Sequence, residues 1–223
     1  MMVINDIDMH KSLVFLSALN HNNSKVWFDE NRKTYELCRK EFIDFVGDII
    51  AQMSPFDPTF EALEAKKCIF RINRDIRFSK DKSPYKNNFG AWFTALGAEK
   101  GGYYLHLQPG NQTFVGGGIY MPPNDVLKKI RQEIDYGSSE FHAILNEPHF
   151  KKLFPVLKGD KLSRPPKGYD DAHPDIEMLK HKSFVVSVNI SDQEIIDGKL
   201  KDKTIEAFTV MKSFVDFLNR AFE

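Results

Sequence analysis

Residues 103–121, YYLHLQPGNQTFVGGGIYM, hold two runs of aromatic, branched and glycine residues separated by a turn. Tyr103–Gln108 and Thr113–Met121 have the composition of β-strands, and QPGNQT between them has the composition of a turn. Strands joined by so short a turn run antiparallel. The stretch therefore predicts a β-hairpin.

The pairing of this hairpin decides what its side chains face. If Pro109 pairs with Gln112, then Tyr104 lies opposite Gly117, and alternation places Tyr104, His106 and Gln108 on one face. Either Tyr104 covers the glycine, or the glycine leaves room for a pocket in which His106 and Gln108 are polar contacts. His106 is the histidine to test as an acid or base.

Outward from the hairpin, the chain reads as helices, then adjacent strands, then helices. Further strands are expected at Lys67–Asn73, Asn88–Leu96 and within SFVVSVNI, residues 183–190. One long amphipathic helix follows the N-cap Ser24 and closes at Pro55, with a gap in its apolar pattern at Asn31. Another is expected at about Lys203 to Phe222. Regular βαβ alternation is absent, which predicts an α+β fold. We expect a single domain over residues 1–223, with a mainly antiparallel sheet covered by N- and C-terminal helices.

The overall charge argues against a polyelectrolyte partner. The 223 residues include 31 basic and 31 acidic side chains, whereas a nucleic-acid binder usually shows a basic excess. Cys38 and Cys68 fall at apolar positions, which predicts buried, reduced thiols and a cytoplasmic protein. The sequence lacks a signal-peptide pattern and an apolar run of roughly 20 residues, so no membrane partner is expected.

Residues 70–86, FRINRDIRFSKDKSPYK, concentrate positive charge in a chain whose net charge is zero. The basic residues are Arg71, Arg74, Arg77, Lys80, Lys82 and Lys86. In a straight strand Arg74 would lie on the apolar side. Either the strand bends near Asn73, or Arg74 is buried and must be paired. Asp75 and Asp81 are the nearest acids in sequence.

Two functions fit this segment, beside a plain surface loop. An Arg–Asp network can hold the loop in place as a scaffold, or the cations can converge on an external phosphate or carboxylate. Ser79 and Ser83 offer hydroxyl groups, and Tyr85 offers a flat ring. Aromatic rings among cations also suit stacking on a nucleic-acid base.

A long loop later in the chain, SRPPKGYDDAHPD, carries Arg164, Lys167 and His173. It is either a stiff surface loop held by prolines or a loop that folds over a site. His173 with the adjacent aspartates lacks the spacing of a metal site, so no metal is expected. Phosphate-binding, dinucleotide-binding and serine-hydrolase motifs are absent from the sequence. The sequence therefore leaves the cofactor unknown.

Four blocks resemble the uncharacterised family called domain of unknown function 2461. They are FLSALNHNNSKVWFDENRKTYE (15–36), RINRDIRFSKDKSPYKNNFGAWF (71–93), GGYYLHLQPGNQTFVGGGIYMPP (101–123) and RPPKGYDDAHPDIEMLKHKSF (164–184). Together they cover nearly the whole chain in one order. The resemblance implies a single-domain, soluble, mostly bacterial protein and no established activity. The blocks include the three stretches singled out above, which suggests one shared site.

The leading hypothesis is a site for an anionic, phosphorylated or carboxylated small molecule. The six basic residues of 71–86 supply charge, Tyr85, Tyr104 and Gln108 shape the site, and Arg164 and Lys167 close it. Whether the protein is an enzyme stays open; His106 and Asp75 are the candidate proton-transfer groups. The alternatives are a nucleic-acid or protein-binding module, with nucleic acid less favoured, and an Arg–Asp scaffold without a ligand.

Overall fold

The structure is a computed structural model, and it describes residues 8–97 and 99–223. The elements, in chain order, are α1 (His10–His21), α2 (Lys25–Glu30), α3 (Arg32–Met53), the 3-10 helix η1 (Pro58–Ala62), α4 (Ala65–Cys68), β1 (Phe89–Phe93), β2 (Gly102–Leu107), β3 (Thr113–Ile119), α5 (Asn124–Tyr136), α6 (Ser138–Asn146), α7 (Pro148–Leu153), α8 (Ile176–Leu179), β4 (Phe184–Ile190), α9 (Asp192–Ile196) and α10 (Leu200–Arg220).

The four strands form one antiparallel sheet in the order β1-β2-β3-β4, with flanking helices, which confirms the α+β fold class. The chain divides into two compact units. Unit 1 comprises the residues up to Phe93, Tyr104–Val115 and Asn189–Glu206, and unit 2 comprises the remainder. The single domain stays a prediction. None of the described helices has the length and apolar content needed to cross a membrane.

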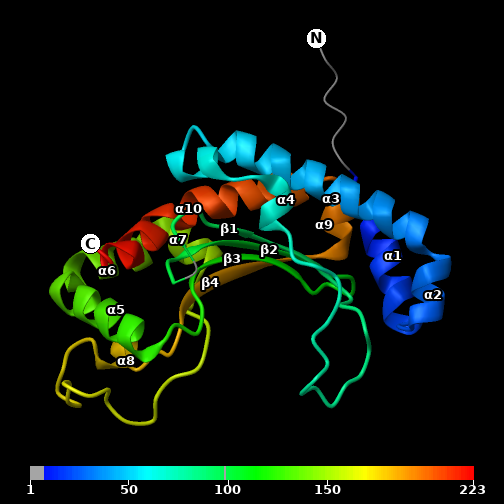
Figure 1. Cartoon of the computed structure of the whole chain (residues 1–223). Coiled ribbons are helices and arrows are strands. Elements are labelled where there is room, and N and C mark those ends of the chain that lie inside the picture. Colours follow the sequence, from blue (N-terminus) through cyan, green and yellow to red (C-terminus); the bar gives the residue numbers. More distant parts are fainter. Residues whose placement is uncertain (1–7, 98) are drawn as a thin grey trace. The chain divides into compact units, whose positions relative to one another are not determined.

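In unit 1, α1 and α2 pack beside α3 (Figure 1). Ser24 caps α2 by accepting a hydrogen bond from the Trp27 amide at 3.3 Å, as its sequence position predicts. The expected single long helix is two helices, α2 and α3, which meet at Asn31. The Asn31 side chain donates to the Trp27 carbonyl at 2.9 Å and shares that acceptor with its own backbone amide, which donates at 3.0 Å. On α3, Phe42 stacks against Phe89 of β1 at 5.3 Å.

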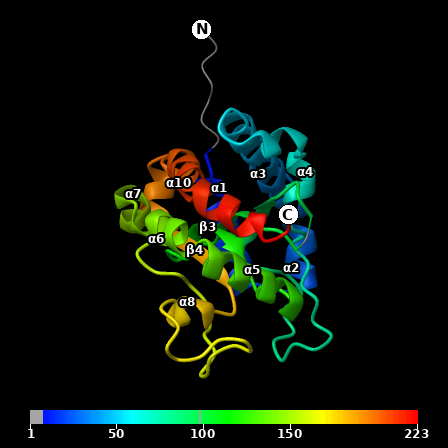
Figure 2. The same cartoon turned by 90° about the vertical axis from the view of Figure 1, so that its left-hand side faces the viewer.

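Unit 2 has its own aromatic core. Phe141 of α6 packs against Phe217 of α10, with ring centroids 5.0 Å apart. Figure 2 shows α5, α6 and the final turns of α10 together, and Arg220 links them by ion pairs to Glu133 at 3.2 Å and to Glu140 at 2.8 Å. These exposed pairs add little stability beside the aromatic packing.

The predicted pairing of the β2–β3 hairpin is wrong by one residue. The His106 ring stacks on Phe114 at 4.8 Å, and the Cα of Tyr103 lies 3.6 Å from where a Cβ of Gly117 would be. His106 therefore pairs with Phe114, and Tyr103 with Gly117. A shift of one residue moves every side chain of β3 to the opposite face. Gly117 consequently faces Met211 of α10, and it is not covered by Tyr104.

The three glycines of β3 allow close packing within unit 2. A Cβ on Gly116 would lie 2.7 Å from the Val186 carbonyl oxygen of β4. Gly118 has a φ of +115°, and a Cβ there would overlap the Phe184 carbonyl oxygen. The glycines are therefore explained by the approach of β4 and α10, and the expected pocket floor at Gly117 is wrong.

The strand predicted at Lys67–Asn73 is also wrong. Its first residues belong to the helical turn α4, and only isolated antiparallel bridges follow, at Ile69 with Ala91 and at Asn73 with Tyr85. Glu64 and Lys67 form an ion pair at 2.6 Å across three residues, a spacing that a helical turn brings together. Beyond Ile69 the chain leaves the sheet as a loop.

Candidate functional site

A chain of polar side chains runs along β2 on the side opposite the buried Leu105 and Leu107. The Tyr104 hydroxyl is 3.1 Å from His106 Nδ1, and His106 Nε2 is 2.8 Å from Gln108 Oε1. Since the amide oxygen only accepts, Nε2 carries the proton and Nδ1 accepts from the tyrosine. These three residues are the ones that the sequence placed on one face.

The rings of His106 and Tyr104 are both uncharged near neutral pH. Burial lowers the pKa of His106, although its hydrogen bond to Gln108 acts in the opposite direction. Burial raises the pKa of Tyr104 to about 12. Because both ring nitrogens of His106 have partners, proton transfer by His106 requires the release of one of them. Its proposed catalytic role stays a prediction.

Gly90 of β1, and Asn88 directly before β1, also belong to this face, although the sequence did not single them out. Asn88 Nδ2 lies 3.4 Å from His106 Nδ1, as a second donor to that nitrogen. A Cβ on Gly90 would lie 2.8 Å from the Tyr104 hydroxyl oxygen and 3.1 Å from Cδ2 of Phe70. Gly90 thus gives Tyr104 and Phe70 the space that they occupy. The alternation Asn88, Gly90, Trp92 within the predicted strand is the signal that identifies this face.

Half of the basic segment is used to hold its own loop. Asp81 accepts hydrogen bonds from Arg74 and from the amide and hydroxyl of Ser83, at 2.9 and 2.7 Å for Ser83. Asp75 accepts from Arg77 Nε at 2.9 Å and from Nη2 at 2.6 Å.

These bonds assign a structural role to part of the segment. The hydrogen bonds from Ser83 and Arg74 lower the pKa of Asp81, and those from Arg77 lower that of Asp75. Lys82 Nζ donates to the Ile76 carbonyl at 3.0 Å. Asp75 is held ionised by its own arginine, which makes it a poorly placed proton-transfer group.

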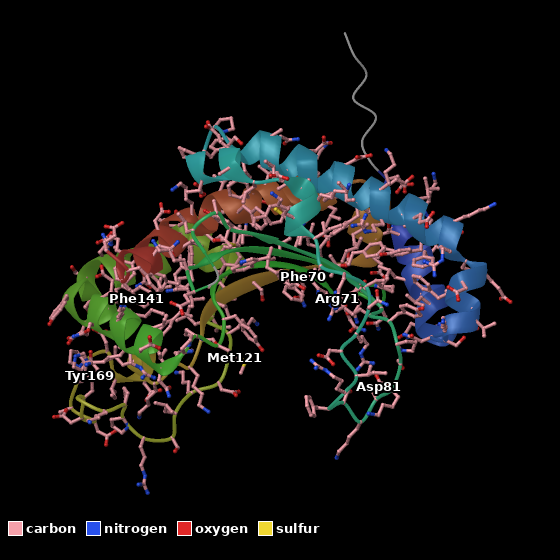
Figure 3. All side chains as sticks on the ribbon, viewed as in Figure 1. Phe70, Arg71, Asp81, Met121, Phe141 and Tyr169 are labelled. Atoms are coloured by element: carbon pink, nitrogen blue, oxygen red, sulfur yellow. The ribbon has the colours of Figure 1, made fainter. Side chains whose placement is uncertain are left out.

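The remaining cations, Arg71, Lys80 and Lys86, form no ion pair with any residue that the structure describes. The Lys86 ammonium lies over the Phe70 ring, 5.3 Å from its centroid. Burial lowers the pKa of Lys86, and the positive charge of Arg71 lowers it further. Figure 3 shows Phe70 and Arg71 near the strands and Asp81 in the distant part of the loop.

Tyr85 is placed differently from the sequence expectation. Its side chain is buried and stacks on Phe28 of α2, with ring centroids 3.9 Å apart and planes at 14°. The backbone amide of Tyr85 donates a hydrogen bond to Asn23 Oδ1 at 3.1 Å. The ring therefore has no face for a ligand, so Tyr85 supports the loop from outside the site. It fixes the base of the basic loop.

The loop with Arg164 and Lys167 belongs to unit 2, where both side chains are exposed. His173 holds this loop, and Arg131 holds the helix α8 that follows it. Arg131 Nε donates to the Leu179 carbonyl at 2.7 Å, and His173 Nε2 lies 3.0 Å from Asp135 Oδ1. The contribution of Arg164 and Lys167 to the site stays a prediction.

Unit 2 also contains a polar cluster that the sequence did not reveal. The buried Asp175 carboxylate accepts from Ser138 Oγ at 2.6 Å and from His142 Nε2 at 2.5 Å. Burial raises the pKa of Asp175, but the two hydrogen bonds outweigh it and keep the pKa below its ordinary value. Over residues 8–97 and 99–223, no group of three His, Cys, Asp or Glu side chains is suited to a metal ion.

A cavity of about 410 Å³ lies among α1, α2 and α3 and shares no residue with the polar chain or the basic loop. Its apolar lining is Val14, Phe15, Ala18, Trp27, Leu37 and Cys38. Cys38 and Cys68 are free and buried, which confirms the expected reduced thiols. Burial raises the pKa of both thiols, so neither is an activated nucleophile.

Comparison with known proteins gives a family and no activity. The family described as a conserved hypothetical protein, DUF2461, matches residues 11–217 of the 223. No curated protein and no solved structure shows significant similarity to the sequence or the fold. The match includes the polar chain, the basic loop and the loop with Arg164. The chain belongs to the conserved hypothetical protein family DUF2461.

Proposed function

We propose that unit 1 binds an anionic, phosphorylated small ligand at Arg71 and Lys86, beside the face formed by Phe70, Tyr104 and His106. One observation carries this proposal. Two neighbouring cations, one of them partly desolvated, have no carboxylate partner among the described residues. Taking a charge out of water without a partner costs free energy, and an anion from outside the protein supplies the missing partner.

The cations of the segment divide by their partners. Arg74 and Arg77 pair with Asp81 and Asp75, so the Arg–Asp scaffold accounts for them. It does not account for Arg71 or for Lys86. The loop thus acts as a support, which orders the segment and leaves the two cations at its base without acids. Supporting charged groups on a fixed frame is the usual way to reduce the cost of binding.

A different feature favours the binding module as a second function. Phe78 is 95% exposed in the basic loop, with Arg77 5.9 Å from its ring centroid. Lys80, which forms no ion pair with a described residue, follows two residues later. An exposed ring between cations suits stacking on a single-stranded base. Tyr85, which this function also requires, is buried.

Thermal unfolding with a ligand panel separates these functions. The panel contains phosphorylated metabolites, nucleotides and short oligonucleotides at matched ionic strength. A ligand at about 100 times its dissociation constant adds about 2.7 kcal/mol to the free energy of unfolding, a rise of several degrees in Tm. The proposal predicts a shift by a small phosphorylated compound that Arg71→Gln abolishes. Arg77→Gln is the matched control, because it removes an equal charge that already has a partner.

The other outcomes are equally informative. A shift with oligonucleotides alone, lost in Phe78→Ala, identifies the binding module. If no compound shifts the unfolding of the wild type, the scaffold without a ligand is the better account. We also propose a cytoplasmic location, which the two free, buried thiols Cys38 and Cys68 support.

A further inference from the structure

We infer that the ligand is a phosphate monoester with a flat apolar group, and that the site prefers it to singly charged esters. This inference rests on the proposed anion site and specifies its ligand class. It follows from two features of unit 1: the two cations at the base of the loop that form no ion pair with a described residue, and the half-exposed Phe70 ring, which lies beside Lys86 and Gly90.

The charge of the site calls for a dianion. Arg71 and Lys86 each carry one positive charge, and each is without a carboxylate within the described part of the chain. A monoanion compensates one of these charges and leaves the other. A phosphate monoester carries a charge of about −1.5 to −2 at pH 7 and has three terminal acceptor oxygens. The guanidinium and ammonium groups together offer about eight N–H donors for those oxygens.

The competing acids are occupied elsewhere. Asp75 and Asp81 are the carboxylates of the same segment, and both are fixed by hydrogen bonds within the loop. The charge of Arg71 also acts on the Asp75 carboxylate, but neither aspartate forms an ion pair with Arg71 or Lys86. The loop contributes to selectivity through this arrangement, because it keeps its negative charges on its own arginines.

The apolar part of the ligand is indicated by Phe70. Its side chain is 49% exposed, although it lies between the Lys86 ammonium at 5.3 Å and the Tyr104 ring at 6.1 Å. Its position is fixed from the other side by Gly90, whose absent side chain gives Cδ2 its space. A fixed, half-exposed ring beside two cations matches a ligand in which a flat group adjoins the phosphate.

Isothermal titration calorimetry at pH 7.5 tests this with three probes, phenyl phosphate, phenyl sulfate and inorganic phosphate. Phenyl sulfate has the same ring and a tetrahedral oxyanion but only one negative charge. We expect phenyl phosphate to bind about tenfold more tightly than phenyl sulfate, because one further charge acts near two cations. In Arg71→Gln and in Lys86→Gln this preference falls below about threefold, and in Arg77→Gln it is retained. Phe70→Ala weakens phenyl phosphate and leaves inorganic phosphate unchanged.

The failure of this inference differs from that of the proposed site. Equal affinity for phenyl phosphate and phenyl sulfate, with both lost in Arg71→Gln, overturns the dianion preference and leaves the anion site in place. Binding of none of the probes, or binding that neither Arg71→Gln nor Lys86→Gln weakens, overturns both. Thermal unfolding of each variant shows that a lost affinity is not a lost fold.

Discussion

The substitution Gly90→Ala tests the packing of Tyr104 and Phe70 against Gly90. The new Cβ would lie 2.8 Å from the Tyr104 hydroxyl oxygen, 3.1 Å from Phe70 Cδ2 and 3.3 Å from Tyr104 Cε2. Overpacking of this kind costs about 1–3 kcal/mol. Replacing glycine also lowers the entropy of the unfolded chain, which stabilises the folded protein by about 0.4–1 kcal/mol. We expect a net loss of about 1–2 kcal/mol.

The closest contact predicts a specific rescue. Tyr104→Phe removes the hydroxyl that Gly90→Ala meets first, and it leaves His106 Nδ1 with only the longer contact to Asn88 at 3.4 Å. Alone, Tyr104→Phe should cost about 1 kcal/mol. In the double variant the hydroxyl clash is absent, so the double variant should be about 1 kcal/mol more stable than the sum of the single effects.

Urea denaturation of the four proteins of this cycle measures the coupling free energy. The circular dichroism midpoints and slopes give each free energy of unfolding. Gly47→Ala in α3 serves as a control, because a Cβ there makes only an ordinary contact, 3.9 Å from the Cβ of Ala65. Its effect should be additive with Tyr104→Phe. If Gly90→Ala and Tyr104→Phe are also additive to within about 0.3–0.5 kcal/mol, the described packing of Tyr104 over Gly90 is incorrect.

Three further substitutions test other parts of the molecule. Gly118→Ala should lower the free energy of unfolding by at least about 3 kcal/mol more than Gly168→Ala in urea denaturation, because both have positive φ but only Gly118 lies against the β4 backbone. Ion pairing with Lys203 and the capping box lower the pKa of Glu194 to about 2 from its ordinary 4.5. Its contribution is full above pH 4.5 and is lost as pH falls from 4.5 through about 2, so Glu194→Gln should destabilise by about 1 kcal/mol at pH 7 and by clearly less at pH 2.5 in thermal unfolding. Burial lowers the pKa of His181 to about 4 from 6.5, so only the unfolded chain takes up this proton between those values. Stability should fall as pH drops from 6.5 to 4, and His181→Gln should flatten this slope in urea denaturation.

Local pattern was sufficient to predict the fold class and one face of the site. The spacing of apolar residues located α3 and α10, and alternation along β2 put Tyr104, His106 and Gln108 together. The gap at Asn31 marked the point where two helices meet. These features depend on neighbours within a few residues, which is the range over which a single sequence carries information.

The register of the hairpin depends on a distant residue. Asp192 Oδ2 accepts from the Gly110 amide at 2.8 Å, and Asp192 Oδ1 accepts from the Asn111 amide at 3.1 Å. Asn111 has a φ of +58°, and its Oδ1 accepts a hydrogen bond from the Asp192 amide at 2.9 Å. This contact joins the turn to the start of α9, some 81 residues later. Turn composition alone does not contain it, and the predicted register was therefore one residue off.

The sequence alone also could not predict which acids and basic residues of the loop form ion pairs. Asp75 and Asp81 are the nearest acids in the sequence, but six basic residues can form ion pairs with two acids in several ways. In the loop, Asp81 forms an ion pair with Arg74 and Asp75 forms one with Arg77. Arg71 and Lys86 form no ion pair with a described residue. Tyr85 is an aromatic residue among cations, a pattern that suggests a ligand contact. In the structure its ring is covered by Phe28 of α2, which lies far away in the sequence. Both results depend on tertiary contacts that override local composition.

The pKa of Lys86 tests the anion site most directly. It can be followed through the ¹³Cε chemical shift of the lysine in an NMR titration, with Lys86→Gln to assign the signal. We predict a pKa below that of an ordinary lysine in the free protein, because of burial and the charge of Arg71, and a rise when phenyl phosphate is bound. An ordinary pKa that saturating phenyl phosphate leaves unchanged would contradict the proposed site.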